Sequence, residues 1–153
     1  MKKTVILGLL IILLAFSFFG CGDDDNDPPP VTKISIISIT EKTGVASIML
    51  YSSFTLSSDP VAGGQGTISN NSLNDIPMQT TSGSGWNGQA AGGSYMIFLV
   101  FSDMSMYAYT GGSTFETLQI NTFDDLNTKL PKLDVGLGSM LNFSNFKDIA
   151  EFN

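Results

Sequence analysis

The alternation of apolar and polar positions after residue 31 predicts a β-rich fold. Residues 33–39 alternate isoleucine with serine, and the alternation slips by one position between Ile36 and Ile37. Such a slip predicts either a β-bulge or a strand buried on both faces. Residues 45–52 predict a second strand with apolar residues on both faces. The residues expected on the two faces are, in turn, Ala46, Ile48 and Leu50, then Met49 and Tyr51.

The longest apolar run of the domain lies in residues 94–102, where seven apolar residues follow one another. The run is too short for a core helix and is flanked by glycine and by Ser-Asp, so it predicts the central strand. Residues 104–110 are predicted to pair back against it. Tyr107 and Tyr109 share one face of that second strand. They form a recognition strip if the face is exposed, and pack under a neighbouring element if it is not.

Two short extended segments, residues 66–69 and 73–79, are predicted on either side of an Asn70-Asn71 turn, because asparagine tolerates positive φ. Pro77 has no N–H to donate to a ladder, so the second segment is expected at the edge of a sheet. Residues 57–66, which precede both segments, are predicted to be a loop.

Glycine interrupts the periodicity in two places. Gly63-Gly64-Gln65-Gly66 resembles half of a phosphate-binding loop, but no lysine follows it, so we interpret it as a mobile turn. Residues 80–93 contain five glycines and Trp86, the only tryptophan. Its indole either stacks on a sugar ring or a protein partner, or folds back to cover one end of the core. We favour the second interpretation, because aromatic residues on loops commonly close open β-cores.

One short helix is predicted near the C-terminal end of the chain. Thr122 and Asp125 have the spacing of a helix cap, and Pro131 ends the helical pattern. A last strand is predicted around residues 137–144. Residues 145–152 either extend that strand or form one helical turn, and the pattern leaves both alternatives open.

About seven strands separated by close turn signals predict an all-β domain over residues 31–153. A single small β-sandwich of immunoglobulin-like or transthyretin-like size, with one short helix, fits this spacing. A small closed barrel is the alternative. The pattern does not determine the order of the strands.

The first 20 residues have the pattern of a secretory signal. Two lysines precede an apolar run over residues 5–19, and Gly20 stands before Cys21, the only cysteine. The run is shorter than the ~20 residues that a membrane-spanning helix needs. Phe18-Phe19-Gly20-Cys21 resembles a bacterial lipobox, with phenylalanine where leucine is usual, as in spirochaete-type lipoproteins. The resemblance implies cleavage before Cys21, acylation of its sulfur and anchoring in a membrane.

Residues 21–30 are predicted to be a solvated acidic and proline-rich tether. Four aspartates within five positions repel one another, and three prolines stiffen the chain behind them. The alternate aspartates do not make a calcium-binding EF-hand, because Pro28 and Ile34 occupy the positions of its glycine and its glutamate. Gly22 follows the cysteine, where aspartate is the signal for retention in the inner membrane. This favours the outer membrane of a bacterial cell envelope.

Charge and composition exclude several classes of function. Without the leader the chain has five lysines, no arginine and 14 acidic residues, which is a formal charge of −9. Nucleic acids and anionic lipid head groups are therefore not expected as partners. Because the chain has no histidine, it has no Ser-His or Cys-His pair, and we expect no cofactor and no metal. A glycoside hydrolase that uses two carboxylates is the remaining enzymatic alternative, a remote one.

A second resemblance extends over residues 66–146. Four segments resemble the strand-and-turn modules of small spirochaete-type lipoproteins: residues 85–88, 93–101, 107–112 and 142–146. Among these are the "GSY" and "Y-x-Y-T-G" strands and an "NFSxF" segment. The resemblance implies no activity that could be transferred to this chain.

These observations predict a lipid-anchored protein of the cell envelope that is not an enzyme and that binds an envelope or host protein or a glycan. Cys21 is the predicted lipidation site, through which the acyl chains reach the membrane. Trp86, Tyr107 and Tyr109 are the candidate binding residues. A structural or assembly accessory protein of the envelope is the alternative function. The oligomeric state does not follow from the sequence.

Overall fold

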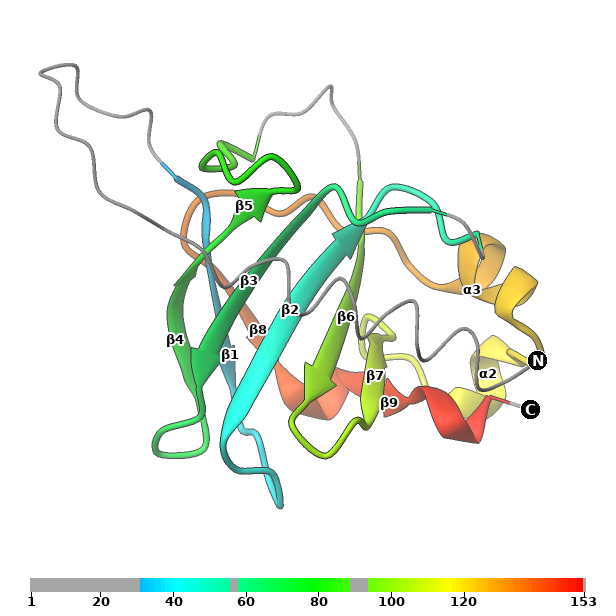
Figure 1. Cartoon of the computed structure of the whole chain (residues 1–153). Coiled ribbons are helices and arrows are strands. Elements are labelled where there is room, and N and C mark those ends of the chain that lie inside the picture. The colour runs from blue at the N-terminus through cyan, green and yellow to red at the C-terminus, as the bar shows by residue number, and fades with distance from the viewer. Residues whose placement is uncertain (1–30, 56–57, 89–93, 153) are drawn as a thin grey trace, which may run out of the picture.

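A computed structural model of the chain describes residues 31–55, 58–88 and 94–152. Within these residues it contains nine β-strands, two short α-helices and two 3₁₀ turns (Figure 1). The strands are β1 (Lys33–Ile37), β2 (Val45–Tyr51), β3 (Ala62–Thr67), β4 (Leu73–Pro77), β5 (Gln79–Thr80), β6 (Met96–Phe101), β7 (Met106–Tyr109), β8 (Ser139–Asn142) and β9 (Phe146–Asp148). The helical elements are α2 (Phe115–Leu118), α3 (Phe123–Lys129), η1 (Phe143–Asn145) and η2 (Ile149–Glu151).

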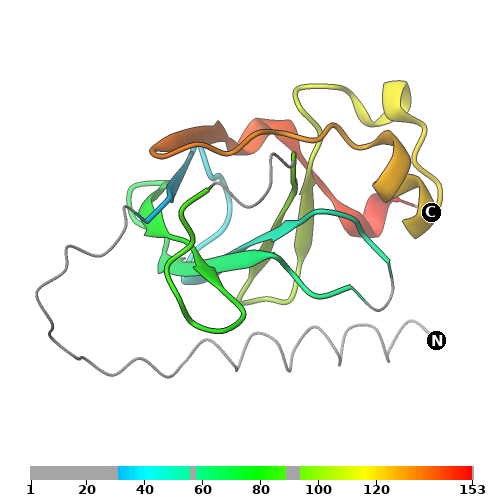
Figure 2. The ribbon, with the colours of Figure 1, turned by 90° about the horizontal axis from the view of Figure 1, so that it is seen from above.

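The strands form two sheets that pack face to face. The smaller sheet has the order β4-β1-β8, and the larger has the order β5-β3-β2-β6-β7-β9. The pairing of β1 with β8 is parallel, and the other strand pairings are antiparallel. The α2 and α3 helices lie at one end of the molecule, and β4 and β5 lie at the other (Figures 1 and 2). The predicted small all-β sandwich is confirmed.

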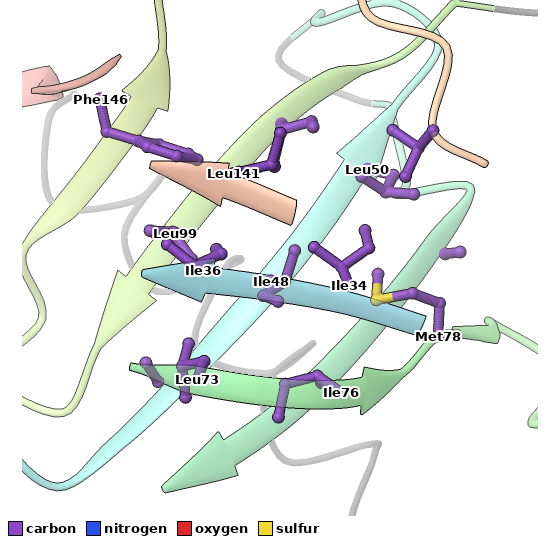
Figure 3. Close-up of a cluster of buried hydrophobic side chains, with 14 of the residues drawn as sticks. Ile34, Ile36, Ile48, Leu50, Leu73, Ile76, Met78, Leu99, Leu141 and Phe146 are labelled. Atoms are coloured by element: carbon purple, nitrogen blue, oxygen red, sulfur yellow. The ribbon is translucent and has the colours of Figure 1, made fainter. Parts of the chain in front are cut away.

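Apolar side chains from both sheets fill the space between them (Figure 3). The smaller sheet contributes buried residues from all three strands, among them Ile34, Ile36, Leu73, Ile76 and Leu141. The larger sheet meets them with Ile48, Leu50 and Leu99. Burying one such aliphatic side chain stabilises a fold by roughly 1.5–3 kcal/mol, so this inter-sheet core is the main source of stability.

A second apolar cluster covers the opposite face of the larger sheet, beneath α3. Its buried members from the sheet include Met49, Tyr51 and Phe98, and α3 contributes Leu126. The β6 strand lies between β2 and β7, and all six of its residues are buried. Apolar residues are therefore needed on both faces of β6, which explains its uninterrupted apolar run. The prediction that this run forms the central strand is confirmed.

The slip in the isoleucine pattern of β1 and the bulge beside this strand are two separate features of the structure. A bulge interrupts the pairing with β4, since Ile34 pairs with Ile76 while Ile36 pairs with Leu73. The extra residue lies on β4 at Asp75, whose φ is 50°. The slip itself comes from Ser38, which has a φ of 61° and returns the following isoleucine to the core. A bulge is thus present in the β1–β4 pairing, but it lies opposite residues 34–36 and not at the predicted position between Ile36 and Ile37.

Two local predictions about the β3–β4 region are confirmed. Asn70 and Asn71 form the turn, with φ values of 51° and 58°. Backbone bonds between Ser69 and Ser72 close it, at N–O distances of 2.9 and 3.0 Å. Pro77 ends β4, which is an edge strand of the smaller sheet. Its missing N–H therefore breaks no ladder.

The glycine-rich segment before this turn is a strand, and our interpretation of it as a loop was wrong. Gly63-Gly64-Gln65-Gly66 lies inside β3 and pairs with β2 along its whole length. The reason is the close approach of β4 from the smaller sheet. A Cβ added to Gly64 would lie 2.7 Å from the carbonyl oxygen of Pro77, and one added to Gly66 would lie 2.3 Å from Cδ1 of Ile76. Glycine is present because the second sheet occupies the space of a side chain.

Gly64→Ala is therefore expected to destabilise the domain by roughly 1–3 kcal/mol, because the new methyl group overlaps a backbone carbonyl that cannot rotate away. Gly136→Ala is the matched control. Nothing lies within 4 Å of a Cβ at that position, so its free energy of unfolding should change by no more than about 0.5 kcal/mol. Urea denaturation followed by circular dichroism measures both variants, and equal midpoints would refute the close approach of the two sheets.

The predicted helix is α3, which begins at its Thr122 cap as expected. Thr122 and Asp125 form a reciprocal capping box, and Lys129 lies 3.1 Å from a carboxylate oxygen of Asp125. The sequence pattern missed α2, whose four residues include none that is buried. The C-terminal tail does not extend β8, because η1 follows that strand and β9 pairs with β7 in the larger sheet. The alternative of one helical turn occurs as η2 at the end of the tail.

Candidate functional site

Trp86 is part of the inter-sheet core. Only 2% of the residue is exposed, and its ring meets that of Tyr95 edge to face at a centroid distance of 5.1 Å. Backbone bonds hold it on both sides, because its N–H donates to the carbonyl of Met78 at 2.9 Å and its own carbonyl accepts from Thr32 at 2.7 Å. The indole therefore closes one end of the core, as the favoured interpretation predicted. An exposed stacking position for Trp86 is contradicted by this burial.

Tyr107 and Tyr109 share the core-facing side of β7, as predicted, and aromatic residues from the C-terminal segment cover part of each ring. The Tyr107 centroid lies 5.1 Å from that of Phe143, and the Tyr109 centroid lies 5.2 Å from that of Phe146. Both tyrosines are half-buried. Partial burial raises the pKa of the Tyr107 hydroxyl. The two rings consequently contribute to packing and do not form a flat exposed strip with Trp86.

The predicted lipidation site, Cys21, lies outside the described residues, and so do the signal segment and the tether. The described chain begins at Val31, directly before β1. Across residues 31–55, 58–88 and 94–152, no helix combines the length and the hydropathy needed to cross a bilayer.

A polar cluster that the sequence pattern did not reveal joins the β1–β2 loop to the β6–β7 turn. The amine of Lys42 donates to Asp103 Oδ2 at 2.6 Å and to the hydroxyl of Ser105 at 2.7 Å. The same amine lies 5.4 Å from the ring centroids of both Phe101 and Tyr107. More than sixty positions separate Lys42 from its two polar partners, so only the antiparallel sheet brings them together.

A serine beside a lysine is the arrangement of some hydrolytic enzymes, in which the neutral amine removes the hydroxyl proton. Here the hydrogen bond to Asp103 raises the pKa of the Lys42 amine, so the amine is protonated and cannot act as a base. The same bond, together with those from Ser105, holds the pKa of Asp103 well below its usual range. The Ser105 hydroxyl donates to Asp103 at 2.5 Å. We call Lys42, Asp103 and Ser105 the clasp, because their hydrogen bonds tie the β1–β2 loop to the β6–β7 turn.

Metal ligation has no site in the described part of the chain. Among residues 31–55, 58–88 and 94–152, no group of three or more acidic, cysteine or histidine side chains lies close enough to hold an ion. Asp125 of α3 serves the capping box and the ion pair with Lys129.

A groove on the described surface lies along β3. Its volume is about 400 Å³, and eight residues line it: Val45, Gly63, Gly64, Gln65, Gly66, Thr67, Pro77 and Gln79. None of them is charged. The groove exists because β5 pairs with β3 only at Ala62 and Gly63. The strand between them in the chain, β4, belongs to the smaller sheet and does not pair with β3. An edge of the larger sheet is therefore left uncovered from Gly64 to Thr67.

This edge was not predicted from the sequence, because the glycine segment was expected to be a loop. The signal that was available is the spacing of the glycines. Gly64 and Gly66 alternate with Gln65 and Thr67, so one face of the segment has no side chains and the other is polar. An alternation of glycine with polar residues is consistent with a strand pressed against a second layer.

Comparison of the chain with protein-family models, with curated proteins and with solved structures finds no match.

Proposed function

We propose that this chain is a lipid-anchored protein of the bacterial cell envelope that acts by binding another macromolecule and not by catalysis. The observation that carries the proposal is the segment Phe18-Phe19-Gly20-Cys21, which follows a short apolar run and precedes an acidic tether. β1 begins at Lys33, so only Val31 and Thr32 separate it from the end of that tether. An acylated cysteine at position 21 would hold the sandwich close to a membrane, where the surface of the domain is open to binding partners.

The geometry favours a protein as the partner over a glycan. Sugar binding commonly uses exposed aromatic faces, but Trp86 is buried and the rings of Tyr107 and Tyr109 are partly covered. The groove along β3 instead offers backbone groups on an uncovered sheet edge, which suits an extended peptide segment. The nucleophile nearest to an amine, Ser105, belongs to a clasp with a protonated lysine, which supports a role without catalysis.

A structural or assembly role in the envelope is the second candidate function. The uncovered edge of β3 favours it, because natural proteins usually protect such edges with charged residues, proline or a covering element. The edge from Gly64 to Thr67 has neither a charged side chain nor a proline of its own. A protein that presents this edge from a membrane surface is suited to join its sheet to that of another chain.

Replacing Cys21 with serine is expected to remove the anchor. The native protein should give an N-terminal peptide that begins at Cys21 and carries acyl chains, because the sulfur is the attachment point. The Cys21→Ser protein should lack that added mass and should move from the detergent phase to the aqueous phase in a phase-separation assay. Phe18→Leu, which restores the usual lipobox residue, is the control and should remain in the detergent phase. An unmodified thiol or an intact leader on the native protein would contradict the proposal.

A further inference from the structure

The hydrogen-bond phase of β3 determines which of its backbone groups face the uncovered edge. The Ile68 N–H donates to the Gly44 carbonyl at 2.9 Å, just beyond the Val45–Thr67 pair. Bonded pairs in an antiparallel ladder recur every second residue, so Gly66 and Gly64 direct their N–H and C=O groups toward β2. The N–H and C=O groups of Gln65 and Thr67 consequently point away from β2, toward the groove.

These outward groups have no strand beside them in the described chain. Gly63 is the last residue of β3 that pairs with β5, and β4 belongs to the other sheet. The side chains of Gln65 and Thr67 are exposed. The edge thus offers two residues with free ladder positions, one on each side of Gly66.

This edge is complementary to a copy of itself. If two β3 strands lie antiparallel around a two-fold axis at Gly66, Gln65 of each copy stands opposite Thr67 of the other. Both residues are in the phase that exchanges N–H···O bonds, so every outward donor meets an outward acceptor. Moving the axis to Gln65 would place Thr67 opposite Gly63, which already pairs with Gln79. The register centred on Gly66 is the one that uses the free groups.

The lining of the groove adds no charge repulsion between two copies at this place. The chain without its leader has a formal charge of −9, so two copies repel each other over most contacts. The groove along β3 is lined without any charged side chain. Two identical molecules can therefore meet at this edge without placing like charges opposite each other.

We propose that two copies of this chain associate through the uncovered edge of β3, in an antiparallel pairing of Gln65 with Thr67 that joins their larger sheets. The inference extends the proposed function by naming the partner, and it rests on that function only for the confinement of copies to one membrane. Confinement raises the effective concentration, so a weak contact in solution becomes a populated dimer on the membrane.

Two double variants test the register. In Gln65→Lys/Thr67→Lys, lysines stand opposite each other across the dimer, whereas in Gln65→Lys/Thr67→Glu each lysine stands opposite a glutamate. Sedimentation of the full acylated chain in density-matched detergent micelles gives the dimer dissociation constant. We expect the first variant to dissociate roughly tenfold more readily than the native chain, and the second to associate at least as tightly as the native chain. Both substituted positions are exposed, and thermal melting checks that both variants fold.

Three results would overturn the proposal: a monomeric native chain at every concentration tested, equal dissociation constants for the two double variants, or a monomeric chain whose β3 edge instead takes up a strand from another protein. The last result would assign the edge to a foreign partner. Each of them leaves lipid anchoring intact, because the mass of the N-terminal peptide decides that question independently.

Discussion

Replacing Phe98 with aspartate should leave the domain unfolded. Phe98 lies at the middle of β6, its exposure is 0%, and its ring meets those of Tyr51 and Phe54 at centroid distances of 5.4 and 5.2 Å. A carboxylate at this position would be buried without a charged partner, which costs several kcal/mol on top of the lost packing. Far-ultraviolet circular dichroism should show no cooperative thermal transition. Phe98→Ala, which only removes the ring, is expected to cost roughly 3–5 kcal/mol.

Met140→Asp is the control for this substitution. Met140 lies on β8 with 67% of its surface exposed, so a carboxylate there stays in water. Its free energy of unfolding should change by no more than about 0.5 kcal/mol. A soluble Phe98→Asp protein that melts cooperatively would show that β6 does not occupy the centre of the larger sheet.

Trp86→Ala is expected to lower the free energy of unfolding by roughly 3–5 kcal/mol. The indole is 2% exposed, packs edge to face on Tyr95 and closes the end of the inter-sheet core, so its removal opens a cavity between the sheets. Urea denaturation measures the loss. Trp86→Phe keeps an aromatic ring in the same place and should be distinctly less destabilising than the alanine variant.

The same pair of variants separates packing from recognition at Trp86. If Trp86→Ala leaves the denaturation midpoint unchanged, the indole does not close the core. A simultaneous loss of binding to an envelope partner would then assign Trp86 to recognition. The burial of the side chain and its two backbone bonds lead us to expect the loss of stability.

The elements that were predicted correctly are those whose burial or conformation can be inferred from neighbouring residues in the sequence. β2 and β6 were identified correctly because alternate or continuous apolar residues state directly which faces are buried. α3 was identified from the Thr122 capping box, which involves only neighbouring residues. The Asn70-Asn71 turn was predicted correctly for the same reason, since the tolerance of positive φ is a property of asparagine itself.

The errors concern residues whose role depends on distant parts of the chain. β3 was assigned to a loop because glycine has no side chain whose pattern could show burial. Glycine is needed at position 64 because the carbonyl of Pro77, in the other sheet, occupies the place of a side chain. The clasp of Lys42 was missed because its partners are more than sixty positions away. α2 was missed because it has only four residues, which is too short a stretch to show a helical repeat in the sequence.

The amino-acid sequence alone therefore determined the class of the domain, its central strands and the helix α3, because each depends on short-range pattern. The anchor at Cys21 rests on the same kind of pattern and stays a prediction. Only the tertiary structure decided that β1 and β8 pair in parallel, that Trp86 is buried, and that β5 stops at Gly63 and leaves the edge of β3 uncovered. These features arise from contacts between segments far apart in the chain. The free energy that stabilises them comes from the packing of the two sheets against each other, which no single stretch of sequence encodes.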